Sequence, residues 1–370
     1  MNKFDFIVIG AGMAGASVAA ELSATASVAL LEMEERAGFH ATGRSAAAYE
    51  PNYGPPPILA LTRASRGFFF APPIGFTDAP LITKRGTLVL VPKGSTASGH
   101  DFLTDTRGMP EIGADEILRL VPIIRPDYAT RAFYSMETGD LDVHALHQGY
   151  LRKFKVDGGK LLVSAPAQTI KQLDKVWHVT TPVGTFSAPV IINAAGAWGD
   201  QVANLAGVAG IGLQPKRRSI GVVPLTGYPD FMQWPFMVDV HETWYAKPQS
   251  GKLLISPADA TPVEPHDAYA DDEILAGGIE RFMQATTVEV TRLEHSWGGL
   301  RTFTTDGSPA VGFDPAAEGF FWLVGQGGYG IQTAPAMARL AAALASHKPV
   351  PEDIIAEGLQ LSAISPDRLR

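Results

Sequence analysis

The chain has 370 residues, of which 46% are hydrophobic and 18% charged, a composition typical of a globular protein of about two domains with a substantial core. Its formal net charge of −8 argues against nucleic acid or an anionic membrane as a partner, because both bind basic surfaces. Without cysteine, the chain cannot form disulfides, thiolate metal sites, iron–sulfur clusters or a cysteinyl link to a cofactor.

The beginning of the chain and its apolar runs show no sign of export or membrane insertion. Residues 1–5 lead directly into a strand, without the charged and apolar regions of a signal peptide. No apolar run is long enough to span a bilayer. We therefore expect a cytoplasmic protein with no membrane span and no metal site.

The first 32 residues predict a βαβ unit. Residues 4–9 form a short apolar run of the kind buried in parallel sheets. The sequence GAGMAG follows at residues 10–15, and then an Ala-rich helix and a second apolar run at residues 27–31. Strand, glycines, helix and strand in this order are typical of a unit that binds a dinucleotide.

Each part of this unit has a physical role in dinucleotide binding. Gly10 permits the tight turn between strand and helix, and Gly12 lets the backbone approach the pyrophosphate. Gly15 lets the helix pack closely on the strand. The helix N-terminus attracts phosphate, and Glu32, after the second strand, can accept hydrogen bonds from ribose hydroxyls.

Two later segments also combine a buried strand with small residues directly after it. Residues 187–197 predict a buried strand that ends in small residues, and residues 319–332 predict a strand and a glycine-rich turn before an Ala-rich helix. Small residues let the backbone approach a flat ligand, and a helix N-terminus stabilises negative charge such as a reduced flavin develops. From the residues alone, an ordinary βα turn explains the second segment equally well.

The segments between these pieces predict a further helix and several strands of a different, alternating pattern. Residues 142–156 predict a helix with Asp142 as N-cap. Mixed alternation predicts strands at residues 81–91, 219–225, 237–247 and 252–257, with a hairpin turn at 249–251. We expect an α/β protein, α+β overall, in which a Rossmann-like FAD-binding domain (1–80, 140–215 and 296–370) carries an inserted antiparallel-sheet substrate domain (81–139 and 216–295).

Five sequence blocks support a resemblance to a known family. They are GAGMAG, Glu32, and residues 42–47, 193–198 and 325–330. Together they resemble the D-amino-acid-oxidase superfamily of FAD enzymes over essentially the whole chain. Within it, residues 146–150, 213–219 and 299–301 resemble bacterial FAD-dependent D-arginine dehydrogenase most closely.

The resemblance implies oxidation of a D-amino acid, with hydride passing to flavin N5 and the imino acid hydrolysing to a 2-oxo acid and ammonia. It also implies that FAD is bound noncovalently, although some flavoenzymes attach flavin through a histidine and His40 lies in the flavin loop. The residues expected to bind FAD are Gly10, Gly12, Ala14, Gly15, Glu32, Met33, Thr42, Gly43, Arg44, Ser45, Ala46, Ala47, Ala167, Ala195, Gly196, Gly327, Gly328, Tyr329, Gly330 and Ile331.

The family pattern also implies a substrate site. Arg218 and Arg301 match the arginines that grip the substrate carboxylate, for which a planar guanidinium suits both oxygens. Tyr53 and Tyr245 match tyrosines that cap the carboxylate or close the pocket, and the backbone of Gly328 is expected to accept the substrate amine. These five residues form the expected catalytic set.

The side-chain pocket departs from the D-arginine dehydrogenase pattern. Thr87 stands where that relative places an acid for the guanidinium, and Ala48 stands where it has a histidine. Losing the acid removes a contact that is typically worth ~1.5–3 kcal/mol. We therefore expect a neutral or apolar D-amino acid as the preferred substrate, although Glu50 could restore a carboxylate from another direction.

Two other functions stay open. One is an oxidase or dehydrogenase for another small carboxylate-bearing amine or a 2-hydroxy acid, since the same arginines would hold its carboxylate. The other is a flavin-binding subunit that passes electrons to a partner protein. The sequence does not indicate whether the electron acceptor is a quinone, an electron carrier or oxygen.

Overall fold

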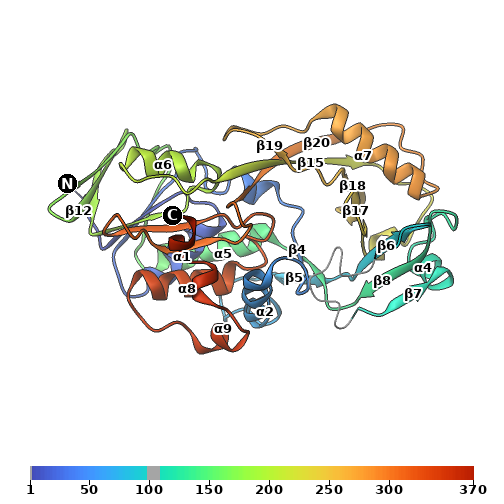
Figure 1. Ribbon diagram of the computed structural model, residues 1–370, viewed down its shortest axis with the longest axis horizontal. Helices are drawn as coiled ribbons and strands as arrows, with labels where there is room; N and C mark the ends of the chain where they lie inside the picture. Colours follow the sequence, from blue (N-terminus) through green and yellow to red (C-terminus); the bar gives the residue numbers. More distant parts are fainter. Residues whose placement is uncertain (1, 98–108) are drawn as a thin grey trace.

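The computed structural model describes residues 2–97 and 109–370, so residues 98–108 of the expected substrate domain lie outside the described part. Two sheet-based bodies lie side by side, and the long strands β15 (Gln214–Val223) and β20 (His295–Phe303) run from one to the other (Figure 1). The termini lie on the body that contains the N-terminal βαβ unit.

A six-stranded sheet forms the centre of the first body. Its strand order is β10-β3-β2-β14-β22-β21, and every pairing is parallel except that of β21 with β22. The strands are β2 (Phe6–Ile9), β3 (Val28–Leu31), β10 (Lys160–Leu162), β14 (Val190–Asn193), β21 (Ala310–Phe313) and β22 (Phe320–Val324). This sheet confirms the expected α/β fold class.

Both faces of this sheet are covered, which explains why its strands are continuously apolar. Phe6 and Val8 pack toward the helices of one face, whereas Ile7 and Ile9 pack toward the other face. The helices of the first face are α1 (Met13–Leu22), α2 (Pro56–Phe70), α5 (Val143–Val156), α8 (Ala334–Ala345) and α9 (Glu352–Ala356). The other face carries α6 (Gly199–Leu205) and the sheet of β1 (Asn2–Lys3), β13 (Gly184–Ala188), β12 (Val176–Thr181) and β11 (Thr169–Leu173).

The second body is built on a larger sheet of order β19-β15-β18-β17-β16-β6-β8-β7, with β20 beside β15. Its further strands are β6 (Thr87–Pro92), β7 (Glu111–Gly113), β8 (Ala129–Ser135), β16 (Phe236–Asp239), β17 (Tyr245–Gln249), β18 (Lys252–Ser256) and β19 (Thr261–Pro262). Helices α4 (Ala114–Leu120) and α7 (Asp272–Ala285) contribute to its core. The sheet is antiparallel except where β16 meets β6 in parallel, which joins strands from the two separate inserted segments.

A third, small sheet has three strands. It consists of β4 (Ala48–Tyr49), β9 (Gly139–Leu141) and β5 (Ile82–Lys84). Within the described residues, no helix is both long and apolar enough to cross a membrane.

Several expected elements differ from the observed ones at turns. Residues 237–247 are two strands, because the Asp239 carboxylate accepts hydrogen bonds from the backbone N–H groups of His241 and Thr243 and turns the chain between them. Residues 81–91 are interrupted at Gly86, whose φ of +83° breaks the strand. The helix at 142–156 is confirmed, with the Asp142 carboxylate accepting from Ala145 N at 2.8 Å.

The close contact between strand β2 and helix α1 gives a test of the fold. A Cβ on Gly15 would lie 1.8 Å from the carbonyl oxygen of Gly10, and this backbone cannot move away. We expect Gly15→Ala to lower the free energy of unfolding by about 3 kcal/mol or more and to reduce the FAD content of the purified protein.

The matched control is Gly67→Ala in the exposed part of α2, where a Cβ would meet nothing within 4 Å. This helical position should gain about 0.5–1 kcal/mol, because alanine lowers the entropy of the unfolded chain. Urea unfolding followed by tryptophan fluorescence measures both variants, and equal stabilities would contradict the packing argument.

Candidate functional site

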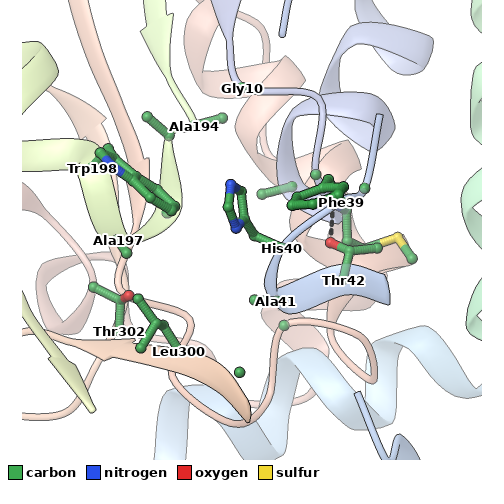
Figure 2. Close-up of a pocket in the computed structure, with 18 of the residues that line it drawn as sticks. Gly10, Phe39, His40, Ala41, Thr42, Ala194, Ala197, Trp198, Leu300 and Thr302 are labelled. Atoms are coloured by element: carbon green, nitrogen blue, oxygen red, sulfur yellow. Dashed lines mark hydrogen bonds between the residues drawn. The ribbon is translucent and has the colours of Figure 1, made fainter. Parts of the chain in front are cut away.

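A large cavity of about 370 Å³ opens where the parallel strands of the first body end. Gly10 follows β2, Glu32 follows β3, Ala194 follows β14, and Gly327 lies beyond β22; all four line the cavity. Ligands of open α/β sheets bind at this edge, because the strand ends and helix N-termini converge there. Figure 2 shows Gly10 and Ala194 on one side of the cavity, with Leu300 and Thr302 on another.

The glycine-rich turn has no side chains that would block a ligand from approaching the protein backbone. Gly10 has φ +100°, and a Cβ there would lie 2.6 Å from the carbonyl oxygen of Ala194. The N-terminus of α1 is held by Thr42, whose hydroxyl accepts from Met13 N at 2.9 Å (Figure 2). A Cβ on Gly12 would lie 3.3 Å from the same hydroxyl, so a larger residue would disturb this contact.

At the other end of the βαβ unit, backbone hydrogen bonds hold the Glu32 carboxylate in a fixed position as a hydrogen-bond acceptor. Its two carboxylate oxygens accept from Ala11 N at 2.8 Å and from Glu34 N at 3.0 Å. Burial raises the pKa of Glu32, and these two backbone hydrogen bonds oppose that effect. The remaining lone pairs can accept from the hydroxyls of a ribose.

The segment that follows β3 closes over the cavity. His40 lies between Phe39 and Trp198, with its ring 4.5 Å from that of Trp198, and its Nε2 is 2.8 Å from Glu34 Oε1 (Figure 2). Arg44 forms an ion pair with Asp267, and its Nη1 also donates to Ala268 O at 2.7 Å. Arg44 therefore ties this segment to the second body, in addition to lining the cavity.

Most residues expected to bind FAD line this cavity. They are Gly10, Gly12, Ala14, Glu32, Met33, Thr42, Arg44, Ser45, Ala46, Ala167, Ala195, Gly196, Gly327, Gly328, Gly330 and Ile331. Sequence reasoning missed Phe39, Trp198, Leu300 and Thr302, which also line it. Trp198 and Leu300 lie in blocks that supported the family resemblance, whereas Phe39 and Thr302 carry no pattern of their own until the fold brings them to the cavity.

Four expected FAD ligands lie outside the lining of the large cavity. Gly15 serves the packing of α1, and a Cβ on Gly43 would lie 2.7 Å from Gly38 O, so this glycine serves a tight turn. The carbonyl oxygen of Ala47 accepts from Leu141 N at 3.3 Å, which anchors the segment to β9. Tyr329 lines a second, smaller cavity instead.

Strands β15 and β20 bring the expected arginines together. Lys216 is paired with Arg301 across the two strands, and Arg218 is two residues further along β15. Because side chains alternate along a strand and paired residues share a face, these three side chains lie on one face of the sheet. Arg217 lies on the other face, with its Nη2 2.7 Å from Asp271 Oδ2.

The arginine pair faces both cavities. Arg218, Arg301 and Gly328 line the large cavity and also the second one, which has a volume of about 170 Å³. Arg218 Nε donates to Asp259 O at 2.6 Å, whereas within the described residues no hydrogen bond or ion pair engages the Arg301 guanidinium. Burial, and then the charge of Arg301, lower the pKa of Arg218, but a guanidinium stays charged. This arrangement favours a bound anion.

The expected tyrosines and Gly328 surround the arginine pair. The buried hydroxyl of Tyr245 has no partner within the described residues, and the Arg218 guanidinium carbon lies 5.8 Å from its ring centroid. Tyr53 OH donates to Glu242 Oε1 at 2.9 Å. A Cβ on Gly328 would lie 2.9 Å from Arg301 Nη1, so glycine is required for the guanidinium to keep this position.

The expected side-chain pocket is arranged differently. Ala48, Glu50 and Thr87 line neither of these two cavities. Glu50 and Thr87 are buried next to each other, with Glu50 Oε1 accepting from Asn52 N at 3.2 Å. Ala48 belongs to β4, where it pairs with Asp140 of β9.

The large cavity fits FAD. A glycine turn and a helix N-terminus suit the pyrophosphate, and Glu32 suits a ribose. At the opposite end of the lining, Gly327 and Gly328 leave room for a flat ring beside two arginines. Within the described residues no group of three or more acidic or histidine side chains is placed to hold a metal ion.

Comparison with known proteins agrees with this geometry. The family model described as "FAD dependent oxidoreductase" (DAO) matches residues 5–344. A glycine oxidase of Geobacillus kaustophilus is 25% identical over 378 residues, covering 95% of this chain and 96% of the relative. An L-2-hydroxyglutarate dehydrogenase of Indibacter alkaliphilus is 23% identical over 60% of this chain and 56% of its own length.

Solved structures share the fold. The crystal structure of glycine oxidase from Geobacillus kaustophilus superposes with a TM-score of 0.83 at 21% identity, covering 99% of this chain and 98% of that one. L-proline dehydrogenase from P. horikoshii gives a TM-score of 0.79 at 17% identity, with coverage of 99% and 98%. The matched family model spans most of the sequence, and the chain belongs to the DAO family of FAD-dependent oxidoreductases.

Proposed function

We propose that this protein oxidises a small amine that carries a carboxylate, most specifically a D-amino acid, to an imino acid that water converts to a 2-oxo acid and ammonia. The observation that carries the proposal is the buried pair Arg218 and Arg301 at the glycine-rich end of the FAD cavity. The pair has unused donors, and the nearby carboxylates of Glu242 and Asp259 already accept hydrogen bonds from Tyr53 and Ser219, which leaves the pair suited to a substrate carboxylate.

The protein's contribution is orientation. Two guanidinium groups fix the carboxylate, and the unpartnered Tyr245 hydroxyl can add a third hydrogen bond to it. The carbonyl oxygen of Gly328 can accept a hydrogen bond from the substrate amine and would thereby orient the amine in the FAD cavity. When bound, FAD supplies the hydride-accepting chemistry. Holding the reacting atoms together in this way lowers the barrier without a dedicated acid or base.

The relatives support amine oxidation without deciding the substrate. Glycine oxidase carries an amine substrate in its name, and L-2-hydroxyglutarate dehydrogenase carries a hydroxy acid. A 2-hydroxy acid therefore stays the first alternative, and an electron-transferring flavin subunit the second. The D configuration, and the closer likeness to D-arginine dehydrogenase, stay predictions from sequence. Peroxide release under air distinguishes an oxidase from a dehydrogenase.

The surroundings of Glu50 bear on the substrate side chain. Burial raises the pKa of Glu50 to about 7, and its Oε2 has no hydrogen-bond partner within the described residues. The nearby Thr87 hydroxyl, whose proximity partly opposes the rise in the pKa of Glu50, donates to Thr138 Oγ1 at 3.0 Å. A carboxyl that is about half protonated at pH 7, and that lies outside both cavities, is a weak partner for a substrate guanidinium. We therefore keep a neutral or apolar side chain as the proposed preference.

Kinetics on holoenzyme test the function. Arg301→Met should lower kcat/KM for a D-amino acid by about a hundredfold or more, because a charge-assisted bidentate contact is lost. For an amine substrate that has no carboxylate, Arg301→Met should not cause this selective loss of kcat/KM. Arg292→Met, which removes an exposed arginine, is the matched control and should stay within about twofold of the wild type.

A substrate panel completes this test. D-Leu, D-Met and D-Phe should exceed D-Arg in kcat/KM, and their L forms should be poor substrates. If D-Arg ranked first, the proposed side-chain preference would be wrong. If Arg301→Met reduced all amines equally, the carboxylate role of the arginine pair would be wrong.

The buried Glu50 predicts a pH-dependent stability. Its pKa is raised from 4.5 to about 7, so the folded state binds more protons between these values than the unfolded state. Stability should therefore decrease as pH rises through this range, by up to about 3 kcal/mol. Glu50→Gln should lose most of this dependence, and the exposed Glu289→Gln should retain it, in urea unfolding of the holoenzyme from pH ~5 to ~8.

Noncovalent FAD binding predicts a simple outcome. His40 Nε2 is 2.8 Å from the Glu34 carboxylate, and this contact competes with its use as an attachment point for flavin. Acid precipitation of the purified protein should leave the yellow cofactor in the supernatant. Yellow colour that stays in the pellet, and is lost in His40→Ala, would instead show a covalent link.

A further inference from the structure

On one edge of β15, the strand pairings leave a gap next to Arg218. β20 pairs with residues 214–222 along the other edge, so β18 and β19 share this one. β18 pairs with residues 221–223 and β19 with residues 216–217, and the connection at 257–260 passes between them. The backbone groups of β15 in this gap need hydrogen-bond partners other than a neighbouring strand.

Side chains supply these partners at Ser219. Asp259 Oδ1 accepts from Ser219 N at 2.6 Å, and Asp259 Oδ2 accepts from Ser219 Oγ at 3.0 Å. Ser256 Oγ donates to Ser219 O at 2.7 Å, so both backbone groups of Ser219 are bonded to side chains. The Asp259 side chain is only 4% exposed, and water therefore cannot readily take the place of these contacts.

The same connection holds the Arg218 guanidinium. The backbone carbonyl oxygen of Asp259 accepts from Arg218 Nε at 2.6 Å. The donors on both Nη atoms of Arg218 remain for a ligand, since within the described residues no other hydrogen bond or ion pair engages them. Because a carbonyl oxygen carries no net charge, it fixes the orientation of the guanidinium without neutralising it.

The Asp259 carboxylate would have the opposite effect if it contacted Arg218. A carboxylate and a guanidinium form a strong ion pair, which would compete with a substrate carboxylate. The two hydrogen bonds to Ser219 direct the Asp259 carboxylate away from Arg218. The preceding residue, Ala258, has φ +54°, a conformation that persists in a residue other than glycine where surrounding contacts hold the chain.

We propose that Asp259 and Ser219 are positioning residues for substrate binding. Their mutual hydrogen bonds hold the Asp259 carbonyl on Arg218 Nε and keep the Asp259 carboxylate off the guanidinium. This inference rests on the proposed role of Arg218 in binding the substrate carboxylate. Both residues act through Arg218, so their loss should weaken binding of a carboxylate and leave the chemical step almost unchanged.

The test measures acetate binding to the holoenzyme through the change in flavin absorbance. Asp259→Ala removes both bonds to Ser219 and should raise the Kd for acetate by about tenfold. Asp259→Asn keeps an amide oxygen that can accept from Ser219 N, and should bind acetate at least as tightly as the wild type. Loss of a nearby negative charge alone would tighten acetate binding in both variants, so weaker binding in Asp259→Ala identifies a positioning role.

Two further variants complete the series. Ser219→Ala is a milder change, which removes the 3.0 Å bond but keeps the bond from Ser219 N, and should raise the Kd for acetate by about threefold. It also serves if Asp259→Ala does not fold. Asp127→Ala, at an exposed aspartate of the second body, is the matched control and should stay within about twofold of the wild type.

Steady-state kinetics give a second measurement. The KM for a D-amino acid should rise in the same order as the Kd for acetate, with kcat within about twofold of the wild type, as expected when an interaction common to ground and transition states is lost. Acetate affinity that is unchanged in both Asp259→Ala and Ser219→Ala, or tighter in Asp259→Ala, would overturn the proposal. A fall in kcat without a change in KM would also contradict it.

Acetate binding separates this proposal from the proposed function, because it needs no turnover. If the protein oxidised no amine but acetate affinity followed the expected order, the proposed function would fail and the positioning role would stand. If a D-amino acid were oxidised and acetate affinity did not change in the variants, only the positioning role would be rejected.

Discussion

The pairing of β15 with β20 is the constraint on which the site depends. The register places Arg218 and Arg301 on one face of the sheet, on the two strands that run from one body to the other. Burial, and then the charge of Arg301, lower the pKa of Arg218, and the Glu242 carboxylate opposes this effect. Two buried guanidinium groups so close together favour a bound anion, which is the basis of the proposed carboxylate substrate.

The same two strands also couple the cofactor cavity to the substrate sheet. Leu300 and Thr302 of β20 line the FAD cavity, while Arg44 from the segment after β3 binds Asp267 and Ala268 of the second body. Gly10 lies close to the backbone of Ala194, and Gly328 lies close to the Arg301 guanidinium, so a side chain at either position would disturb the lining of the cavity.

Sequence reasoning succeeded where a local pattern has one physical cause. GAGMAG after an apolar run requires a tight turn that only glycine permits, and Asp142 followed by a helical pattern is an N-cap. The strand predictions were wrong at turns that a side chain stabilises. Asp239 interrupts an expected strand through hydrogen bonds to residues two and four positions on, and such bonds leave no periodic signal.

By itself, the sequence determined the dinucleotide-binding unit and the α/β class, and it supplied the arginines that are proposed to bind a carboxylate. Only the tertiary structure decided which residues share a cavity, because strand register is set by packing across the whole sheet. It separated Arg217, paired with Asp271, from Arg218, and it buried Glu50 beside Thr87 outside both cavities. It also showed that Arg218 and Arg301, from two separate segments, line the same two cavities.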